Sequence, residues 1–572
     1  MIRKALISAS ALLSLTLAAA VSGCGSARPA SVSSDSAPAS ATSGAADGSP
    51  GSGGAAGSAA AGAPAAPVAP VVTDAAGAAL PLVPEPSGVD AGSGHGYPVG
   101  AGTVLRAEGG PAAQAVAGQL AALLRTSTGL PLPVLGGGGS GVLLRLDSSA
   151  ASSALTGPEG YSLSSGPGGV TVTASTGAGL FHGAQTLRQL LPARGTGTVP
   201  AVRITDRPRY AVRSAQLDVA RHFFPVPVVE QLIDLLAEYK LNYLHLHLTD
   251  DQGWRIAVPG LPALTGVGAA TEIGGGPGGY YTDADYRAIV AYAAARYVTV
   301  VPEVDMPAHS NAALTAYPAL GCGGARSAVP RPYTGIGSAP AGLCTTKPAV
   351  YTFVDQVVGA LAAMTPGPYI DIGGDEAYNL SQSAYASFVS RASAIVRAHG
   401  KQPEAWDDAA SADGGPALLG VWHPAKQPAP GVDARVAAAA RAGAKLLMEP
   451  AEHAYLDQKY DPSTQLGVHW AGYVGVPQSY DWDPATFMPG VQPGSVAGVE
   501  AVLWTETMST PQQLQTMLLP RLPALAEVGW TPQADRVWSS FRLRLAAQAP
   551  RWDVQQLAWT RVPDIPWPAQ GQ

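Results

Sequence analysis

The feature of this chain that most restricts its fold is a regular alternation of strand-like and helical segments, which begins near Asp206 and continues towards the C-terminus. In the first helical segment, Val229, Leu232 and Leu236 recur at the spacing of one helix face. Eight other segments have the short apolar pattern of strands. The predicted strands are residues 215–219, 243–248, 298–304, 369–373, 403–406, 418–422, 445–448 and 499–503, and the helices between them include 283–296, 350–364 and 382–398.

This alternation is typical of α/β proteins, and eight strands predict a (β/α)8 TIM barrel with insertions over residues 206–572, which would be the catalytic domain. A doubly wound open sheet is the alternative. Such a sheet would normally carry a glycine-rich nucleotide-binding sequence after its first strand. The first predicted strand here ends instead in Asp218-Val219-Ala220-Arg221, so we predict the barrel.

Residues 80–205 have a different pattern. Helical periodicity occurs at residues 113–124 and 180–191, and strand-like segments occur at 142–146, 160–163 and 170–172. We predict a small α+β domain in front of the barrel. No polar cluster converges in this region, so we expect it to have a structural role.

The N-terminus has the pattern of an export signal, because Arg3 and Lys4 precede an apolar segment that ends in Ser22-Gly23-Cys24. This ending looks like a bacterial lipobox, which predicts a lipoprotein signal peptide over residues 1–23 and a lipid on Cys24. An ordinary secretory signal or an uncleaved membrane anchor is the alternative. We therefore expect an exported protein that is anchored at the cell surface by lipid, or else secreted.

The segment that follows, residues 24–79, consists almost wholly of Ala, Gly, Ser and Pro. It cannot bury enough apolar surface to offset the entropy lost on ordering, so we predict a disordered linker. A linker of this kind would hold the catalytic domain away from the membrane.

The chain contains three cysteines. If Cys24 carries a lipid, Cys322 and Cys344 remain, and an exported compartment would allow them to pair. Their disulfide would close a loop rich in Gly, Ser and Pro and would stabilise the fold by roughly 3 kcal/mol in the chain-entropy model. Two free thiols are the alternative.

Charge and motifs exclude several classes of ligand. Charged residues make up 13% of the chain, the net charge is −7, and no basic cluster suits nucleic acid. No phosphate-binding loop, dinucleotide fingerprint or metal-ligand spacing appears, so we predict no cofactor and no metal. The 11 Trp and 20 Tyr residues suit a neutral, hydroxyl-rich ligand instead.

A barrel enzyme carries its catalytic residues at the carboxyl ends of its strands, and the polar and aromatic residues of this chain follow that rule. In strand order they are Asp218 and Arg221, then Asp250 and Asp251, then Glu303, Asp305 and His309, then Asp375 and Glu376, then Trp406, then Trp422, then Tyr455 and Asp457, and finally Trp504 and Glu506.

These strand ends resemble the motifs of the family 20 glycoside hydrolases, the β-N-acetylhexosaminidases. The five motifs are Asp218-Val219-Ala220-Arg221-His222-Phe223-Phe224-Pro225, His245-Leu246-His247-Leu248-Thr249-Asp250-Asp251-Gln252-Gly253-Trp254-Arg255, Pro302-Glu303-Val304-Asp305-Met306-Pro307-Ala308-His309, Gly373-Gly374-Asp375-Glu376 and Leu503-Trp504-Thr505-Glu506. They occur in the family's order, and the small N-terminal domain is also similar to the one that precedes the family's barrel. The resemblance implies an exo-acting enzyme that hydrolyses terminal β-linked GlcNAc or GalNAc with retention.

The resemblance also implies the roles of Asp375 and Glu376. Most glycosidases place two carboxylates on opposite sides of the sugar. Two neighbouring residues of one strand cannot easily take those positions, because their side chains point to opposite faces of the strand. The pair suits substrate-assisted catalysis, in which the 2-acetamido oxygen attacks the anomeric carbon. Glu376 would be the general acid and then the base, while Asp375 would orient the acetamido N–H and stabilise the oxazolinium-like intermediate. This role requires Glu376 to be protonated near the working pH.

Four further residues are predicted to bind the sugar by hydrogen bonds. Arg221 offers donors to ring hydroxyls, and Asp457 and Glu506 can accept hydroxyl protons. Tyr455 would donate to the acetamido oxygen.

Five residues complete the predicted site. Trp406, Trp422 and Trp504 would pack on the acetamide methyl or a pyranose face, although a core position at the barrel end is the alternative for any single one. Asp250 and His309 match family residues that form a polar network around the acid. A structural histidine is the alternative for His309.

One position departs from the family pattern, because Asp371 stands where family members commonly carry His. A carboxylate facing the barrel interior would raise the pKa of the acid. We expect an altered pH–rate profile, which Asp371→His should change.

Two other functions remain open at this point. A lacto-N-biosidase-like relative would release a disaccharide and would need a longer pocket. A surface carbohydrate-binding protein on a degenerate barrel would have lost a catalytic carboxylate, and both are present. The expected partners are N-acetylhexosamine-terminated oligosaccharides or glycoconjugates, such as chitin fragments, with no nucleic acid and with membrane contact through the lipid only.

Overall fold

The computed structural model describes Thr73 and residues 80–569, except Ser93, Ser148 and residues 150–156, 324–330 and 426–430. The predictions for the signal peptide, for Cys24 and for nearly all of the linker therefore lie outside the described residues. No helix in the described part of the chain is long and apolar enough to span a bilayer.

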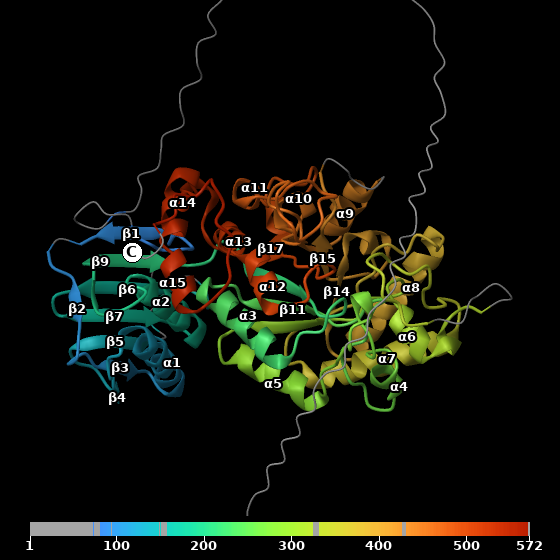
Figure 1. Ribbon diagram of the computed structural model, residues 1–572, viewed down its shortest axis with the longest axis horizontal. Helices are drawn as coiled ribbons and strands as arrows, with labels where there is room; N and C mark the ends of the chain where they lie inside the picture. The colour runs from blue at the N-terminus through green and yellow to red at the C-terminus, as the bar shows by residue number, and fades with distance from the viewer. Residues whose placement is uncertain are drawn as a thin grey trace, which may run out of the picture. The chain divides into compact units, whose positions relative to one another are not determined.

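Eight parallel strands close into a barrel in the order of the sequence, which confirms the predicted TIM barrel (Figure 1). Their bounds agree with the predicted ones to within three residues at each end. The strands are β10 (Val212–Asp218), β11 (Tyr243–His247), β12 (Thr299–Glu303), β13 (Tyr369–Asp371), β14 (Gln402–Trp406), β15 (Leu418–Val421), β16 (Lys445–Met448) and β17 (Val496–Ala501).

Helices cover the outside of the barrel (Figure 1). Local sequence explains where several of them begin: Thr282 and Asp285 form a capping box at the start of α5, and Pro348 stands in the first turn of α7. The helices after the strands include α3 (Val226–Glu238), α5 (Asp283–Ala294), α7 (Pro348–Met364), α8 (Gln382–Ala398), α9 (Val432–Arg441), α10 (Ala451–Ala454), α12 (Pro511–Leu518) and α13 (Arg521–Trp530).

The fourth strand is shorter than predicted. It ends at Asp371 because Gly373 and Gly374 have φ angles of 65° and 103°, which strand residues do not adopt. Asp375 and Glu376 therefore lie on the loop beyond β13. The argument that they point in opposite directions along a strand was wrong, since the loop geometry sets their directions instead.

The predicted α+β domain is present in front of the barrel. Its sheet has the strand order β1 (Gly88–Ala91), β9 (Val202–Asp206), β6 (Tyr161–Gly166), β7 (Gly169–Ala174), β5 (Gly141–Leu146), β3 (Leu105–Glu108) and β4 (Val134–Gly136). The helices α1 (Pro111–Thr128) and α2 (Gly177–Gln189) pack against this sheet, and β2 (Tyr97–Val99) pairs with β8 (Gly197–Val199).

Buried polar contacts join this domain to the barrel. Asp206 accepts hydrogen bonds from the indole N–H of Trp530 at 3.0 Å and from Lys240 at 3.1 Å. Trp530, the last residue of α13, therefore has a structural role at this interface. Two further helices, α14 (Trp538–Ala546) and α15 (Ala549–Val554), lie beside the N-terminal domain (Figure 1).

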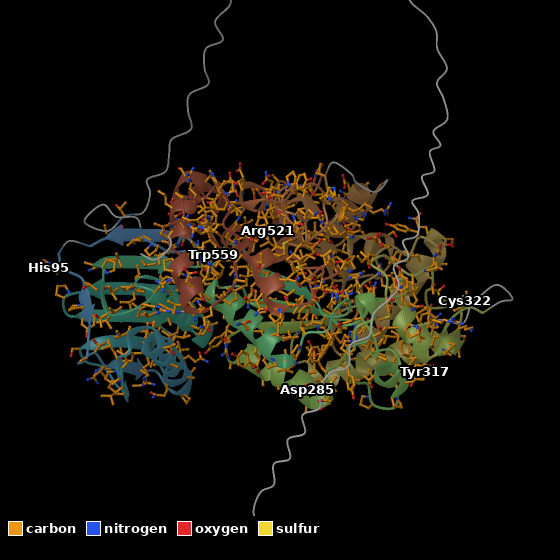
Figure 2. All side chains as sticks on the ribbon, viewed as in Figure 1. His95, Asp285, Tyr317, Cys322, Arg521 and Trp559 are labelled. Atoms are coloured by element: carbon orange, nitrogen blue, oxygen red, sulfur yellow. A yellow bond between two sulfur atoms is a disulfide. The ribbon has the colours of Figure 1, made fainter. Side chains whose placement is uncertain are left out.

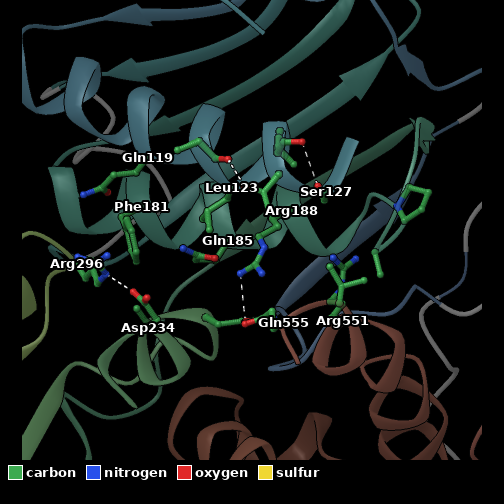
Figure 3. A pocket seen from close by; sticks show the side chains of 18 residues that line it. Gln119, Leu123, Ser127, Phe181, Gln185, Arg188, Asp234, Arg296, Arg551 and Gln555 are labelled. Atoms are coloured by element: carbon green, nitrogen blue, oxygen red, sulfur yellow. Dashed lines mark hydrogen bonds and ion pairs between the residues drawn. The ribbon is translucent and has the colours of Figure 1, made fainter. Parts of the chain in front are cut away.

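A cavity of about 310 Å³ lies at the same interface, lined mainly by α1, α2, α3 and α15 (Figure 3). Its arginines are held by protein groups. Arg188 forms an ion pair with Glu238 at 3.2 Å, and Arg551 donates to the carbonyl oxygen of Gln189 at 2.8 Å. None of the predicted catalytic or sugar-binding residues lines this cavity.

Candidate active site

A smaller cavity, of about 190 Å³, opens at the carboxyl ends of the barrel strands. Nine of the eleven predicted catalytic and substrate-binding residues line it, and Asp250 and Trp406 do not. The nine are Arg221, His309, Asp375, Glu376, Trp422, Tyr455, Asp457, Trp504 and Glu506.

The loop after β13 turns Asp375 and Glu376 towards this cavity. A Cβ atom on Gly373 would lie 2.0 Å from Asp305 Oδ1, so only glycine fits there. The same Asp305 oxygen accepts a hydrogen bond from the N–H of Gly374 at 3.0 Å, and the hydroxyl of Tyr385 donates to the carbonyl of Gly374 at 2.5 Å. These contacts define the position of the two carboxylates.

His309 lies next to the carboxylate pair. Its Nε2 atom is 3.4 Å from Glu376 Oε2 and 3.7 Å from Asp375 Oδ2, while its Nδ1 atom is 3.2 Å from Asp250. His309 and Glu376 both have left-handed backbone conformations, with φ angles of 46° and 51°. Such conformations are uncommon for residues other than glycine and concentrate at functional sites.

Asp250 lies beneath the cavity and connects His309 to Arg221. The guanidinium of Arg221 is 2.7 Å from Asp250 and 3.3 Å from Asp218, and it also lies over the Trp504 ring at 4.8 Å. Asp218 also accepts a hydrogen bond from the backbone N–H of Arg221 at 3.0 Å. Asp218 and Asp250 therefore hold Arg221 in place.

The two neighbouring carboxyls have opposite pKa shifts. The hydrogen bond from His309 lowers the pKa of Glu376, whereas burial raises the pKa of Asp375. Burial alone would lower the pKa of His309, but Asp250 and Asp375 raise it well above its ordinary value. In the free site the contact with His309 therefore lowers the pKa of Glu376, the opposite direction to the one that its role as general acid requires.

Several buried polar atoms of the cavity residues have no hydrogen-bond partner among the described residues. They include Arg221 Nε, Gln252 Oε1, Asp375 Oδ1 and Asp457 Oδ1. Burying such groups unpaired is costly, so they indicate a ligand that supplies both acceptors and donors. Burial and the nearby Glu506 raise the pKa of Asp457 well above its usual range.

Aromatic rings form the rest of the cavity wall. The Tyr455 ring lies 6.3 Å from that of Trp504 and 5.9 Å from that of Trp470. Trp470, which is 45% exposed, also contacts Trp422 edge-on at 6.0 Å. Trp406 lies one layer deeper, only 2% exposed, with its ring 5.7 Å from that of Trp504.

Sequence reasoning assigned no substrate contact to six other lining residues, namely Gln252, Ile336, Gly337, Ser338, Val468 and Trp470. Five of them, Ile336, Gly337, Ser338, Val468 and Trp470, come from loops far in sequence from the end of the preceding strand. The aromatic side chain of Trp470 was the one signal that could have drawn attention to it.

The cysteines Cys322 and Cys344 form a disulfide with a Cα–Cα distance of 4.6 Å. Cys322 lies at the edge of the molecule, in the segment between α6 (Asn311–Ala316) and α7 (Figure 2). The disulfide closes the loop that carries Ser338. That loop reaches the site, because Ser338 donates a hydrogen bond to Glu376 Oε2 at 3.2 Å.

Of the groups of potential metal ligands among the described residues, one includes a catalytic carboxylate. Asp305, His309 and Asp375 each offer an atom within 4.8 Å of the others. Burial raises the pKa values of both Asp305 and Asp375. A proton can therefore neutralise this group, and we assign no metal to it.

Asp371 faces the barrel interior and belongs to a buried cluster of ionisable groups. His245 lies at its centre, 2.9 Å from Glu500, 3.1 Å from Glu303 and 3.7 Å from Asp371. Glu404 also faces Asp371. Burial, with Glu303 adding to it, raises the pKa of Asp371 well above its ordinary value.

The cluster reaches the catalytic pair through a chain of contacts. Glu303 is 2.5 Å from His247 Nδ1, and His247 Nε2 is 3.1 Å from Asp250, which contacts His309. This chain is a physical route by which Asp371 can influence Glu376. An altered pH–rate profile in Asp371→His remains a prediction.

The cluster also predicts how stability depends on pH. Burial raises the pKa values of three carboxyl groups, those of Asp371, Glu404 and Glu449. Burial alone would lower the pKa of His247, but the nearby carboxylates of Glu303 and Asp250 raise it to about 9. Between about pH 5 and 9 the folded state therefore binds protons that the unfolded chain has lost, so the free energy of unfolding falls as pH rises. Carboxyl groups with lowered pKa values are ionised in both states over this range, whereas His182, whose pKa burial lowers, opposes the trend below about pH 6.5.

Asp371→Asn should reduce the slope of the free energy of unfolding against pH by up to about 1.4 kcal/mol per pH unit, which is the contribution of one proton. Urea unfolding at several pH values between 5 and 9 measures it. Asp413→Asn, on the surface, is the matched control and should keep the wild-type slope. Equal slopes for Asp371→Asn and the wild type would contradict the prediction.

Comparison with known proteins agrees with this geometry. The family model for the glycosyl hydrolase family 20 catalytic domain matches residues 210–533, and that for domain 2 of the same family matches residues 79–207. A β-N-acetylhexosaminidase of Cellulomonas fimi is 44% identical over 496 residues, covering 86% of this chain and 98% of the relative.

Two solved structures are similar along the same part of the chain. The Streptomyces plicatus N-acetyl-β-hexosaminidase in complex with Thio-NAglucal has a TM-score of 0.81 and 47% identity, covering 86% of this chain and 98% of the other. The family 20 β-N-acetylhexosaminidase of Streptomyces coelicolor A3(2) has the same TM-score and identity, covering 86% and 99%.

Proposed function

Because the chain belongs to glycosyl hydrolase family 20, we propose that its 190 Å³ cavity binds a terminal N-acetylhexosamine and that Asp375 and Glu376 catalyse its removal. The protein is an exo-acting β-N-acetylhexosaminidase that acts on N-acetylhexosamine-terminated glycans. The observation that carries the residue assignment is the unpaired, buried Oδ1 atom of Asp375, directly beside the more exposed carboxylate of Glu376.

The adjacent carboxylates suit a two-step reaction. In the first step the acetamido oxygen of the sugar attacks the anomeric carbon, the bond to the leaving oxygen breaks, and Glu376 protonates that oxygen. Asp375 accepts a hydrogen bond from the acetamido N–H and stabilises the positive charge of the oxazolinium-like intermediate. In the second step Glu376 takes a proton from water, whose oxygen attacks the anomeric carbon and displaces the acetamido oxygen, so the acetamide is regenerated. Two displacements leave the configuration retained.

The proton for the first step comes from His309. In the free site, the hydrogen bond with His309 lowers the pKa of Glu376, whose side chain is 36% exposed. A bound sugar would remove water from that side chain, and desolvation favours the neutral carboxyl. Binding therefore favours transfer of the proton from His309 Nε2 to Glu376 across the 3.4 Å contact.

Binding contacts for the sugar follow from the unpaired atoms. Arg221 Nε can donate to a hydroxyl oxygen, and Asp457 Oδ1 can accept a hydroxyl proton. The rings of Tyr455 and Trp504 offer apolar surface to the acetamide methyl or the pyranose face. Trp406 would act from beneath Trp504, as support for that ring.

The size of the cavity favours removal of a single sugar. At about 190 Å³ it is smaller than the roughly 300–1,000 Å³ typical of pockets for drug-sized ligands. A disaccharide-releasing enzyme would need a longer pocket. Both catalytic carboxylates line the cavity, which disfavours the alternative of a carbohydrate-binding protein without activity.

Hydrolysis of 4-nitrophenyl N-acetyl-β-glucosaminide, compared with the plain β-glucoside, tests this function. The glucoside lacks the internal nucleophile, whose effective molarity can reach about 10⁵–10⁸ M, so we expect at least about a 10³-fold lower kcat/KM for it. Similar rates for both would remove the substrate-assisted mechanism. Cleavage of neither would favour a binding protein.

We also propose that the protein is held at the cell surface by a lipid on Cys24, which the lipobox-like ending of the apolar N-terminal segment supports. Replacing Cys24 with serine should move the protein from the membrane fraction to the soluble fraction of the expressing cells. An unchanged membrane fraction would contradict lipidation at this residue.

A further inference from the structure

The cavity of about 310 Å³ between the N-terminal domain and the barrel has four wall residues with a buried polar atom that finds no hydrogen-bond partner in the described part of the chain (Figure 3). The atoms are Oε1 of Gln119, Oε1 of Gln185, Oε1 of Glu238 and Nε of Arg551. Gln185, Glu238 and Arg551 are only 5%, 2% and 6% exposed. Burying such groups unpaired is costly, so their gathering around one cavity indicates a polar ligand.

Two ion pairs compensate most of the charge in this cavity. Arg188 pairs with Glu238 at 3.2 Å, and Arg296 pairs with Asp234. Burial lowers the pKa of the third arginine, Arg551, and the nearby carboxylate of Glu238 opposes this shift. A charged ligand would therefore meet a group of its own sign beside every group of the opposite sign, which disfavours both anions and cations.

The unpaired atoms define the chemistry of the ligand. Those of Gln119, Gln185 and Glu238 accept hydrogen bonds, whereas Nε of Arg551 donates one. An anion offers acceptors only, and an ammonium group offers donors only. Hydroxyl groups do both, so a neutral ligand with several hydroxyls can satisfy all four atoms.

Apolar side chains in the same wall suit the C–H surface of a sugar ring. Phe181, Gln185 and Arg188 follow one another along one face of α2, so an aromatic ring lies beside the polar groups (Figure 3). Ala122 and Leu123, on α1, are exposed residues of the wall, so a ligand can enter from the side of α1. The cavity is larger than the one at the barrel end, which has about 190 Å³.

We propose that this interface cavity is a second, non-catalytic binding site for a neutral saccharide. It is separate from the catalytic pair, because no residue lines both this cavity and the sugar cavity. The protein could then hold a glycan at a point away from the site of hydrolysis. This inference does not depend on the function proposed above.

Three methyl β-pyranosides with the same ring test the class of ligand. They are the glucoside, which is neutral, the glucuronide, which is an anion, and the 2-amino-2-deoxyglucoside, which is a cation when its amine is protonated. Saturation-transfer NMR titrations with the full-length protein measure their Kd values. The size of the glucoside predicts a Kd of about 1 mM, and we expect at least about tenfold weaker binding of the charged sugars at this cavity.

A pair of variants on α1 assigns the binding to this cavity. Ala122→Trp places a large side chain at the entrance and should abolish saturable binding of the glucoside there. Ala115→Trp is the same change at an exposed alanine of α1 outside the cavity and should keep the wild-type Kd. Both variants should hydrolyse the 4-nitrophenyl substrate at the wild-type rate, since neither residue lines the sugar cavity.

Replacing Gln185 with leucine separates ligand binding from a purely structural role. Leucine has a similar volume but no acceptor, so we expect a Kd for the glucoside about fivefold higher. The free energy of unfolding should stay the same or rise, because Oε1 of Gln185 has no partner among the described residues. Lower stability in urea with an unchanged Kd would show a structural role instead and would contradict the proposal.

The remaining outcomes distinguish this inference from the proposed function. No glucoside binding by the wild-type protein, or equal binding by Ala122→Trp, would overturn the second site and leave the hydrolase activity intact. Tighter binding of either charged sugar at this cavity would overturn its preference for neutral ligands. Failure of the wild-type protein to cleave the 4-nitrophenyl substrate would reject the proposed function, whereas the second site would still be decided by the binding measurements.

Discussion

Replacing Glu376 with glutamine is expected to lower kcat/KM by about 10²–10⁴-fold for a substrate with an alkyl or sugar leaving group. The amide keeps the size of the carboxylate and its contacts with His309 and Ser338, but it cannot give a proton to the leaving oxygen. Steady-state hydrolysis of the methyl β-glycoside of N-acetylglucosamine measures the loss.

The identity of the leaving group provides an internal control for this variant. A 2,4-dinitrophenolate leaves without protonation, so the loss in Glu376→Gln should shrink markedly for the dinitrophenyl glycoside. Glu230→Gln, on the outer helix α3, is the matched substitution away from the cavity and should retain wild-type rates. A rate for Glu376→Gln within tenfold of the wild type on the methyl glycoside would falsify the assignment of the general acid.

Replacing Asp375 with asparagine is expected to lower kcat by about 10²–10³-fold. The negative charge and the buried Oδ1 acceptor are both aimed at the group that becomes positive in the intermediate. Asparagine removes the negative charge. Its amide can also turn its N–H₂ group towards the acetamido N–H, and two donors cannot form a hydrogen bond with each other. Initial rates at saturating substrate measure this change.

The leaving group distinguishes Asp375 from Glu376. The acetamido oxygen attacks in the same way whatever group departs, so the loss in Asp375→Asn should persist with the 2,4-dinitrophenyl substrate. Recovery of the rate with that substrate would show that Asp375 assists departure of the leaving group. Asp413→Asn, at the surface, is the matched control and should leave kcat unchanged.

The barrel could be predicted from the sequence because its strands are buried and its helices have one apolar face. All four residues of β15, Leu418–Val421, are buried and apolar, which produces a short apolar segment that is visible without any structure. Strand ends could be located to within a few residues, and polar residues beyond them were candidates for the site. Where glycines with positive φ follow a strand, as at Gly373, the apolar pattern overestimated its length.

The wall of the sugar cavity could not be predicted in the same way. Ser338 lies in a loop rich in Gly, Ser and Pro, and Trp470 lies in another loop, so neither belongs to a periodic pattern. They meet Glu376 and Tyr455 because long-range contacts place these loops over the barrel end. No local spacing encodes such a contact.

The pKa values depend on tertiary structure for the same reason. The sequence places Asp375 and Glu376 side by side, yet burial raises the pKa of one and His309 lowers that of the other. Likewise, only the folded barrel brings Asp371 within 3.7 Å of His245. Electrostatic shifts depend on distance and desolvation, and neither is a property of sequence order.

The sequence by itself determined the alternation of strands and helices, the order of the strand-end motifs and hence the family of the enzyme. Those features are local, since each follows from the polarity of a few neighbouring residues. The tertiary structure alone decided which side chains line the sugar cavity and in which direction the pKa of each carboxyl shifts. These properties arise where loops distant in sequence meet and exclude water, so they exist only in the folded protein.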